Sequence, residues 1–448
     1  MHVPVNVRPW LAILTITLIF LSTGLSPAQA SSEESVLSLA QAELLAINNN
    51  PALKAAGKQA EAMAAIPSQV GSLPDPRLSL GTLNLPVDSF STSQEPMTQM
   101  QLGISQAFPF PGKLGLKELA AEHMAAMALQ NQQEFRLVLV RNTRIHWWNL
   151  AYLDSALSIL RHNQELLRNL VRIAETKYKT GKGLQQDVLL AQLELSKLLD
   201  RELMLGAARE SEAASLNALL GRAARSTIVL PRQAGHALSD IKFNVDALKE
   251  SARTFRPMLV AMDYNVQAAD ARVALAEKDN YPDFNLGASY GFRQGVNPAN
   301  GQSRPDMASI MFSMSVPLYS GSKQDKAVDQ RTAEKAAAEF SWQDAANQVD
   351  AEIDAAASDL RISRDRVALF EQGILPQARQ TTASMLAGYQ VNKVDFLNLI
   401  GAQLSKFNME IQYWQQVSRV HQAEARLTAA AGRESLGLTN PHKDDNHE

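Results

Sequence analysis

The side chains that could carry chemistry in this chain are scattered, and their spacing does not describe a catalyst. Serine, histidine and aspartate occur without a nucleophile motif, and there is no glycine-rich phosphate loop. The sequence also has no cysteine, which excludes thiol catalysis, disulfides and thiolate metal sites. We therefore expect no enzymatic activity and no cofactor.

Histidines and methionines are the remaining candidates for binding metal ions. No two histidines are three or four residues apart, as a zinc site on one helix face requires, so we predict no metal site. His442 and His447 lie in a polar, acidic tail, where a disordered segment without function is favoured over weak metal binding. Three methionine pairs have the spacing of a shared face. Ordinary packing is the favoured explanation for the first two pairs, which have helical spacing, whereas the third pair shares one face of a strand and is harder to dismiss. These pairs are Met124 and Met127, Met258 and Met262, and Met307 and Met311.

Two parts of the chain repeat one plan at an offset of 206 to 211 residues. The matching segments are 50–51 and 256–257, 76–81 and 282–287, and 178–222 and 389–433. Self-similarity of this length indicates a duplicated structural unit. We predict a first repeat at 31–222, a linker at 223–243, a second repeat at 244–434 and a disordered tail at 435–448.

Residues 1–30 have the features of a secretory signal peptide. Arg8 gives the N-terminal region a positive charge, residues 10–21 are apolar, and Ala28-Gln29-Ala30 is typical of a cleavage site. No other stretch approaches 18 uninterrupted apolar residues, so we expect no transmembrane helix after residue 30.

Four segments alternate between apolar and small or polar residues with the period of a strand. They lie at about 77–83, 98–108, 283–292 and 307–316, with loops of Pro, Ser, Asn and Gly at 84–97 and 294–305. Such alternation is typical of an outer-membrane β-barrel wall, and a half-buried soluble sheet produces it too. Four strands cannot close a cylinder. We expect at least two chains to complete it, and three would make a twelve-stranded barrel.

The rest of the sequence predicts very long helices. Residues 116–180 contain no Gly or Pro, and neither do residues 322–372. Apolar residues recur at alternating three- and four-residue steps, as Leu150, Leu153, Leu157 and Leu160 do. This heptad spacing requires a partner helix along the whole seam. An ordinary coiled-coil rod would explain the heptad spacing of the helices, but it would leave the four strands unexplained.

Together these features resemble the TolC family of outer-membrane efflux proteins over residues 34–433. The most specific match is Tyr178-x-x-Gly181 followed by Asp187-Val188-Leu189-x-Ala191-Gln192, which is similar to the family's helix-turn-helix tip; 389–403 is its second copy. Within the family, residues 73–76 and 105–113 are most similar to the heavy-metal subgroup of the CzcC and CusC type.

The resemblance implies a mainly α fold with a small β membrane part. A homotrimer would form a twelve-stranded β-barrel in the outer membrane lipid of a Gram-negative bacterium, on an α-barrel in the periplasm. Its partners would be a periplasmic adaptor (membrane fusion) protein and an inner-membrane pump of the RND type. The near-neutral net charge of −3 gives no reason to expect nucleic acid.

The implied function is the exit duct of a tripartite efflux system, most similar to ducts for heavy-metal cations. Alternatives are a duct for drugs or for type I protein secretion, and, in another class, a non-channel coiled-coil envelope protein.

The resemblance also places a channel gate and an adaptor surface at the helical tips. Asp187 occupies a family acidic site, for which local helix capping is the competing explanation. Its second-repeat counterpart is Asn398, so Asp395 is a possible substitute for the missing acid. Gly181 and Asn392 suit a turn that needs positive φ. The adaptor contacts would be Tyr178, Gly181, Lys182, Tyr389, Asn392 and Lys393.

Overall fold

A computed structural model describes residues 36–231 and 243–433. The predicted signal peptide, the tail with His442 and His447, and residues 232–242 of the linker lie outside the described residues. At the linker's start, Ile228 and Leu230 are buried, and the backbone N–H of Leu37 donates to the carbonyl of Val229.

The first repeat contains three short helices, two strands and two long helices. They are α1 (Leu39–Asn49), α2 (Pro51–Ala64), α3 (Ile66–Gly71), β1 (Arg77–Leu83), β2 (Gln99–Phe108), α4 (Lys113–Lys179) and α5 (Gln185–Leu219). Pro51 follows Asn50, whose side chain accepts hydrogen bonds from the next backbone N–H groups and so begins α2.

The second repeat follows the same order. Its elements are α6 (Val245–Phe255), α7 (Pro257–Lys278), β3 (Phe284–Phe292), β4 (Met307–Met314), a 3₁₀ turn (Ser320–Ser322), α8 (Gln324–Leu369), a π-turn (Phe370–Ile374), α9 (Leu375–Gln390) and α10 (Phe396–Ala430). Helical structure therefore continues beyond the expected end at Gln372. The π-turn carries the chain past Gly373 and Pro376, because Pro lacks the N–H that an uninterrupted α-helix would use.

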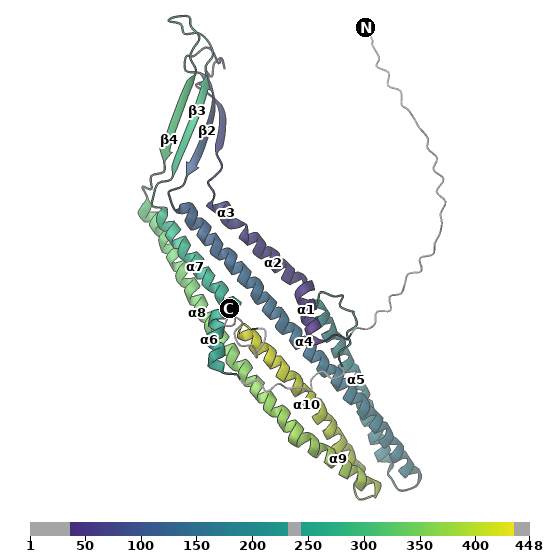
Figure 1. Ribbon diagram of the computed structural model, residues 1–448. Helices are drawn as coiled ribbons and strands as arrows, with labels where there is room; N and C mark the ends of the chain where they lie inside the picture. The colour runs from purple at the N-terminus through teal and green to yellow at the C-terminus, as the bar shows by residue number, and fades with distance from the viewer. Residues whose placement is uncertain (1–35, 232–242, 434–448) are drawn as a thin grey trace, which may run out of the picture. The chain divides into compact units, whose positions relative to one another are not determined.

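The four strands form one antiparallel sheet in the order β1-β2-β3-β4 (Figure 1). β1 has the predicted bounds, β2 and β3 begin one residue later than predicted, and β4 ends two residues earlier. Consecutive strands pair throughout, so β1 and β4 are the two edges.

The strand register gives the sheet two unlike faces. Leu80 lies opposite Leu102, which lies opposite Tyr290, so apolar side chains from neighbouring strands share one face. The other face carries small and polar residues such as Ser79, Gly103 and Ser289. On the apolar face Leu80 is 83% exposed and Ile310 is 85% exposed.

The helices form a layer in which α4 packs against α2, α3, α5, α7 and α10, and α8 packs against α7 and α10. Figure 1 shows α4, α7 and α8 side by side below the sheet. The predicted heptad seam is buried, with Leu150 and Leu160 fully enclosed. None of the helices in the described part of the chain has the length and hydropathy that crossing a membrane requires.

Candidate functional site

The predicted tips are two helical turns with the same backbone structure. One joins α4 to α5, and the other joins α9 to α10. Gly181 and Asn392 have φ values of +67° and +59°, as the turn requires. The N–H of Lys182 donates to the carbonyl of Lys177 at 2.8 Å, and the N–H of Lys393 donates to Gly388 at 2.9 Å.

The two turns differ in which of two facing positions carries a glycine and which carries a larger side chain. In the first turn Lys177 faces Gly183, where an added Cβ would lie 2.9 Å from the Lys177 Cβ. In the second turn the glycine is at the other position, and a Cβ at Gly388 would lie 2.5 Å from the Val394 Cγ2. Each turn therefore tolerates only one large side chain of the pair.

Lys177 links the two turns. Its Nζ donates to the backbone carbonyl of Tyr389 at 2.6 Å and to the Oδ1 of Asn392 at 2.7 Å. The ammonium also lies 3.9 Å from the centroid of the Tyr389 ring. Because α9 ends at Gln390, the cation sits at the negative end of that helix. The first repeat thus supplies a C-terminal cap for the second.

The two equivalent tyrosines have different environments. Tyr389 is 4% exposed and packs against Phe396, with ring centroids 5.2 Å apart. Tyr178 is 48% exposed at the end of α4. Burial, with the nearby Asp187 carboxylate adding to it, raises the pKa of the Tyr389 hydroxyl, and this hydroxyl has no hydrogen-bond partner within the described residues. Tyr178 is therefore a surface residue of the single chain, whereas Tyr389 is a packing residue within it.

Asp187 lies in the first turn of α5 and is partly buried. Burial raises the pKa of its carboxyl, and the Asp395 carboxylate adds to the rise. A hydrogen bond from the Leu184 backbone and the Lys177 ammonium act in the opposite direction. The Leu184 contact at the start of α5 fits the capping explanation.

The other predicted residues of the tips are exposed. Asp395 is the exposed N-cap residue of α10, and its side chain makes no capping hydrogen bond. Asn398 is exposed one turn later. Lys182 and Lys393 are exposed at equivalent places. The structure therefore gathers Asp187, Asp395, Tyr389 and Lys177 at the two tips.

Sequence reasoning missed Lys177. The signal available was an asymmetry of the repeat, because a lysine beside Tyr178 stands where the second copy has Gly388 beside Tyr389. A charged residue present in one copy and replaced by glycine in the other indicates a contact between copies.

Within the described ranges, no group of three or more His, Asp or Glu side chains is placed to hold a metal ion. Met258 and Met262 pack against a buried cluster of α6, α7, α8 and α10. Met307 and Met311 lie on the small and polar face of the sheet, opposite Gly291 and Gly287.

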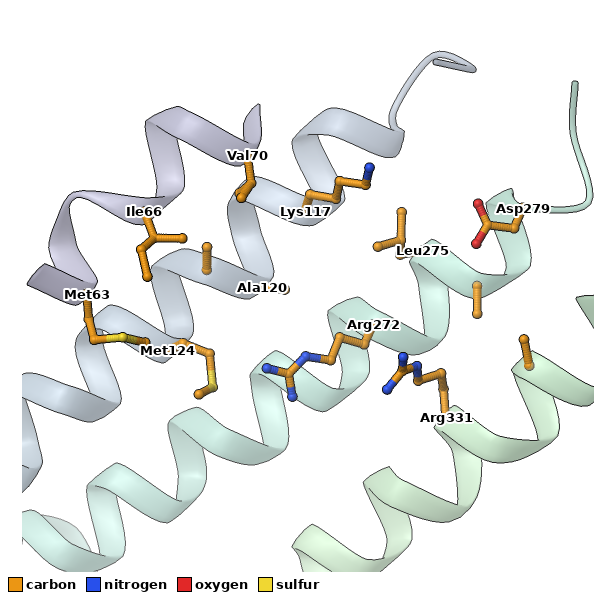
Figure 2. Close-up of a pocket in the computed structure, with 13 residues that line it drawn as sticks. Met63, Ile66, Val70, Lys117, Ala120, Met124, Arg272, Leu275, Asp279 and Arg331 are labelled. Atoms are coloured by element: carbon orange, nitrogen blue, oxygen red, sulfur yellow. The ribbon is translucent and has the colours of Figure 1, made fainter. Parts of the chain in front are cut away.

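Met124 lines a cavity of about 510 Å³ between α2, α3, α4, α7 and α8. Figure 2 shows Met63, Ile66, Val70 and Met124 on one side of this cavity. Arg272, Arg331 and Asp279 lie on the other side together with Leu275, and Lys117 extends from α4 toward them. The lining of this cavity mixes apolar and cationic residues, and it contains no set of metal ligands.

Comparison with known proteins agrees with this geometry. The family model described as outer membrane efflux protein matches residues 44–222 and 248–433. The cobalt-zinc-cadmium resistance protein CzcC of Cupriavidus metallidurans is 21% identical over 443 residues, covering 94% of this chain and 98% of the relative. It represents the subgroup that the sequence motifs predict.

Solved outer-membrane proteins have the same fold. VceC of Vibrio cholerae has a TM-score of 0.74 at 19% identity, covering 88% of this chain and 96% of its own. CusC, described as undergoing transmembrane channel formation, has a TM-score of 0.74 at 16% identity. The match covers 88% of this chain and 92% of the CusC chain. The family and the fold are those of channels. Since the family model matches both repeats, the chain belongs to the outer membrane efflux protein family, and it is an outer-membrane efflux channel that extends into the periplasm.

Proposed function

We propose that three copies of this chain form the exit duct of a tripartite efflux system for heavy metals. The duct passively conducts substrate that an inner-membrane pump delivers through a periplasmic adaptor. The observation that carries this proposal is the sheet, with two unlike faces and two unpaired edges.

The apolar face of the sheet suits lipid rather than water. Its side chains, among them Leu80, Leu102 and Ile310, are exposed in the single chain, and covering such a face with lipid removes its contact with water. Backbone groups on the outer sides of β1 and β4 cannot remain unpaired in lipid. Pairing β4 of one copy with β1 of the next satisfies them, and three copies of a four-stranded sheet give twelve strands.

The helical layer supports closure in the same way. α2 and α3 lie on one side of α4, and α8 lies on the far side of α7, so these helices form the two margins of the layer. Margins that meet between neighbouring copies extend the barrel as a helical tube. We assign the repeats to 31–222 and 244–434, joined by the linker at 223–243, with a removed signal peptide at 1–30 and a disordered tail at 435–448.

The tips are the end of the tube that would meet the adaptor. We assign the contact to Tyr178, Gly181, Lys182, Asn392 and Lys393, with Tyr389 positioning the second turn. Asp187, Asp395 and Asn398 would line the gate. A ring of three Asp187 carboxylates attracts cations.

CzcC, named for cobalt, zinc and cadmium resistance, supports heavy-metal cargo. Export of drugs or of secreted proteins is the alternative, and the identity of the cognate pump decides between them.

Single-channel conductance of the purified protein in a planar bilayer tests the duct. Leu102 and Gln101 are neighbours on β2 that face opposite sides of the sheet, and they make a matched pair. We expect Leu102→Lys to destabilise the inserted barrel by ~2–4 kcal/mol, because it places a charge in lipid. Gln101→Lys should insert normally and change only conductance.

Failure of the unmodified protein to insert, together with a detergent-free soluble oligomer, would contradict the channel. Equal tolerance of the two lysines would contradict the assignment of the faces.

A further inference from the structure

An arginine-rich groove lies between α4, α8 and α10, away from the helical tips. It has a volume of about 460 Å³. Its polar lining includes Tyr152, Asp359, Arg366, Arg419, Gln422 and Arg426. None of these residues takes part in the sheet, in the turns or in the gate.

The positive charges of this groove exceed its negative charges. Arg366 and Arg419 are exposed, and neither has a carboxylate within 4.0 Å among the described residues. Arg426 reaches one carboxylate, that of Asp359, and only at 4.0 Å. Three guanidinium groups therefore share a single acid.

One buried polar group in the groove lacks a partner. Gln416 lines the groove and is 2% exposed, yet its amide Oε1 has no hydrogen-bond partner within the described residues. A buried amide without a partner costs free energy unless a ligand or a water pairs with it. The unpaired atom is an acceptor, so it needs a donor such as a water and does not itself attract an oxyanion.

The groove opens on one particular side of the helical layer. On α8, Asp350 and Asp354 form ion pairs with α6. At about 100° of turn per residue, Asp359 lies roughly 180° from Asp350 and 140° from Asp354. The groove side of α8 is therefore opposite the side that α6 covers.

α4 shows the same arrangement. Trp147 donates its indole N–H to the carbonyl of Leu37, and Arg144 pairs with Glu43 of α1. Asn149 of the groove is about 200° from Trp147 around the helix. α1 and α6 thus cover one side of the layer, and the groove lies on the other. Extra helices on the inner side would obstruct the conduit, so the groove faces the lumen.

We propose that this groove binds multivalent oxyanions, carboxylate- or phosphate-bearing solutes, inside the duct. This inference rests on the proposed channel function and refines its substrate class. Planar guanidinium groups bind both chemistries through paired hydrogen bonds. Three copies place a belt of nine arginines around the lumen. A metal ion that leaves as a polycarboxylate complex is an anion, and it passes this belt more readily than a bare cation does.

Bilayer recordings of the full-length channel test the proposal, with citrate and inorganic phosphate as probes. We expect citrate in the bath to block the current and the double variant Arg366→Gln/Arg419→Gln to weaken this block by about tenfold or more, because charged hydrogen bonds are lost. The same variant should shift the reversal potential in a KCl gradient toward cation selectivity. Arg361→Gln is the matched control, since Arg361 is an exposed arginine of α8 about 200° from Asp359.

The outcomes separate this inference from the channel proposal. Absence of conductance contradicts the proposed function itself. Normal conductance with no block by either anion, or with block that the double variant leaves unchanged, overturns the groove and leaves the channel in place. Stronger block by citrate than by phosphate assigns the site to carboxylates, and the reverse order assigns it to phosphates.

Discussion

The turn between α4 and α5 and the turn between α9 and α10 have one backbone but different side-chain environments. Both have a residue with positive φ and the same reverse hydrogen bond. Tyr389 is buried beneath its turn, whereas Tyr178 stands exposed beside the other. The first turn supplies the cation that caps the second, and no equivalent contact runs in the opposite direction among the described residues.

This difference shows how the duplicated halves divide two tasks. Hydrogen bonding of the backbone is repeated because any sharp turn between antiparallel helices needs it. Packing is not repeated, because only one of the two turns can lie against the other. We infer that the second turn is held in place and the first presents its side chains to a partner.

Truncation of the two tyrosines should give the largest contrast. Tyr389→Ala removes a buried ring, and we expect local stability to fall by about 3–5 kcal/mol. Tyr178→Ala removes an exposed ring, and its effect should stay within about 0.5 kcal/mol. Hydrogen exchange of the amides in residues 385–400 measures the first effect, and exchange in the equivalent residues 174–189 measures the second. Equal losses would mean that Tyr178 is also buried, by a neighbouring copy.

Loss of the Lys177 cap should have the next largest effect. Lys177→Met keeps the stem but removes the ammonium, and we expect about 1–2 kcal/mol of lost protection in the second turn, since the lysine is half-buried. Lys179→Met, two residues away and exposed, is the matched control. Loss confined to the first turn would contradict a link between the copies.

The residues with positive φ should respond unequally to substitution. Gly181→Ala introduces a Cβ at φ +67° and should cost about 1 kcal/mol. Asn392→Gly relaxes the same conformation but removes an acceptor for Lys177, so a near-neutral result is expected. Thermal unfolding of the purified oligomer, with each variant beside the unmodified protein, checks the order.

Acidification should have the smallest effect. The pKa of Asp187 is raised in the folded chain, so the folded state binds a proton more readily than the unfolded state does. The folded arrangement of the tips therefore gains stability as the pH falls toward about 4 and loses it as the pH rises through this window. The unfolding temperature of the purified oligomer should rise slightly on acidification, and Asp187→Asn should abolish the change. A pH response that persists in Asp187→Asn would assign it to another group.

Much of the fold was predictable because its patterns are periodic. Alternation placed four strands, and heptad spacing placed the long helices, whose leucines such as Leu160 are buried as expected. The positive φ of Gly181 and Asn392 followed from residue type alone. The Lys177 contact and the arginine groove join residues on helices far apart in sequence, and no local pattern records which helices become neighbours. The π-turn was also missed, because Gly373 and Pro376 usually end a helix.

The two repeats have helices of equal length. α4 spans 67 residues, and the stretch from the start of α8 through the π-turn to the end of α9 lies 211 residues further on at both ends. α5 and α10 each span 35 residues. The five extra residues of the second repeat lie between β4 and α8, outside this matched set. One residue inserted into a single long helix would advance its tip by about 1.5 Å and rotate it by about 100°, withdrawing Lys177 from Tyr389. A lineage that lengthens this duct to span a wider periplasm must therefore insert equal segments into all of these helices together.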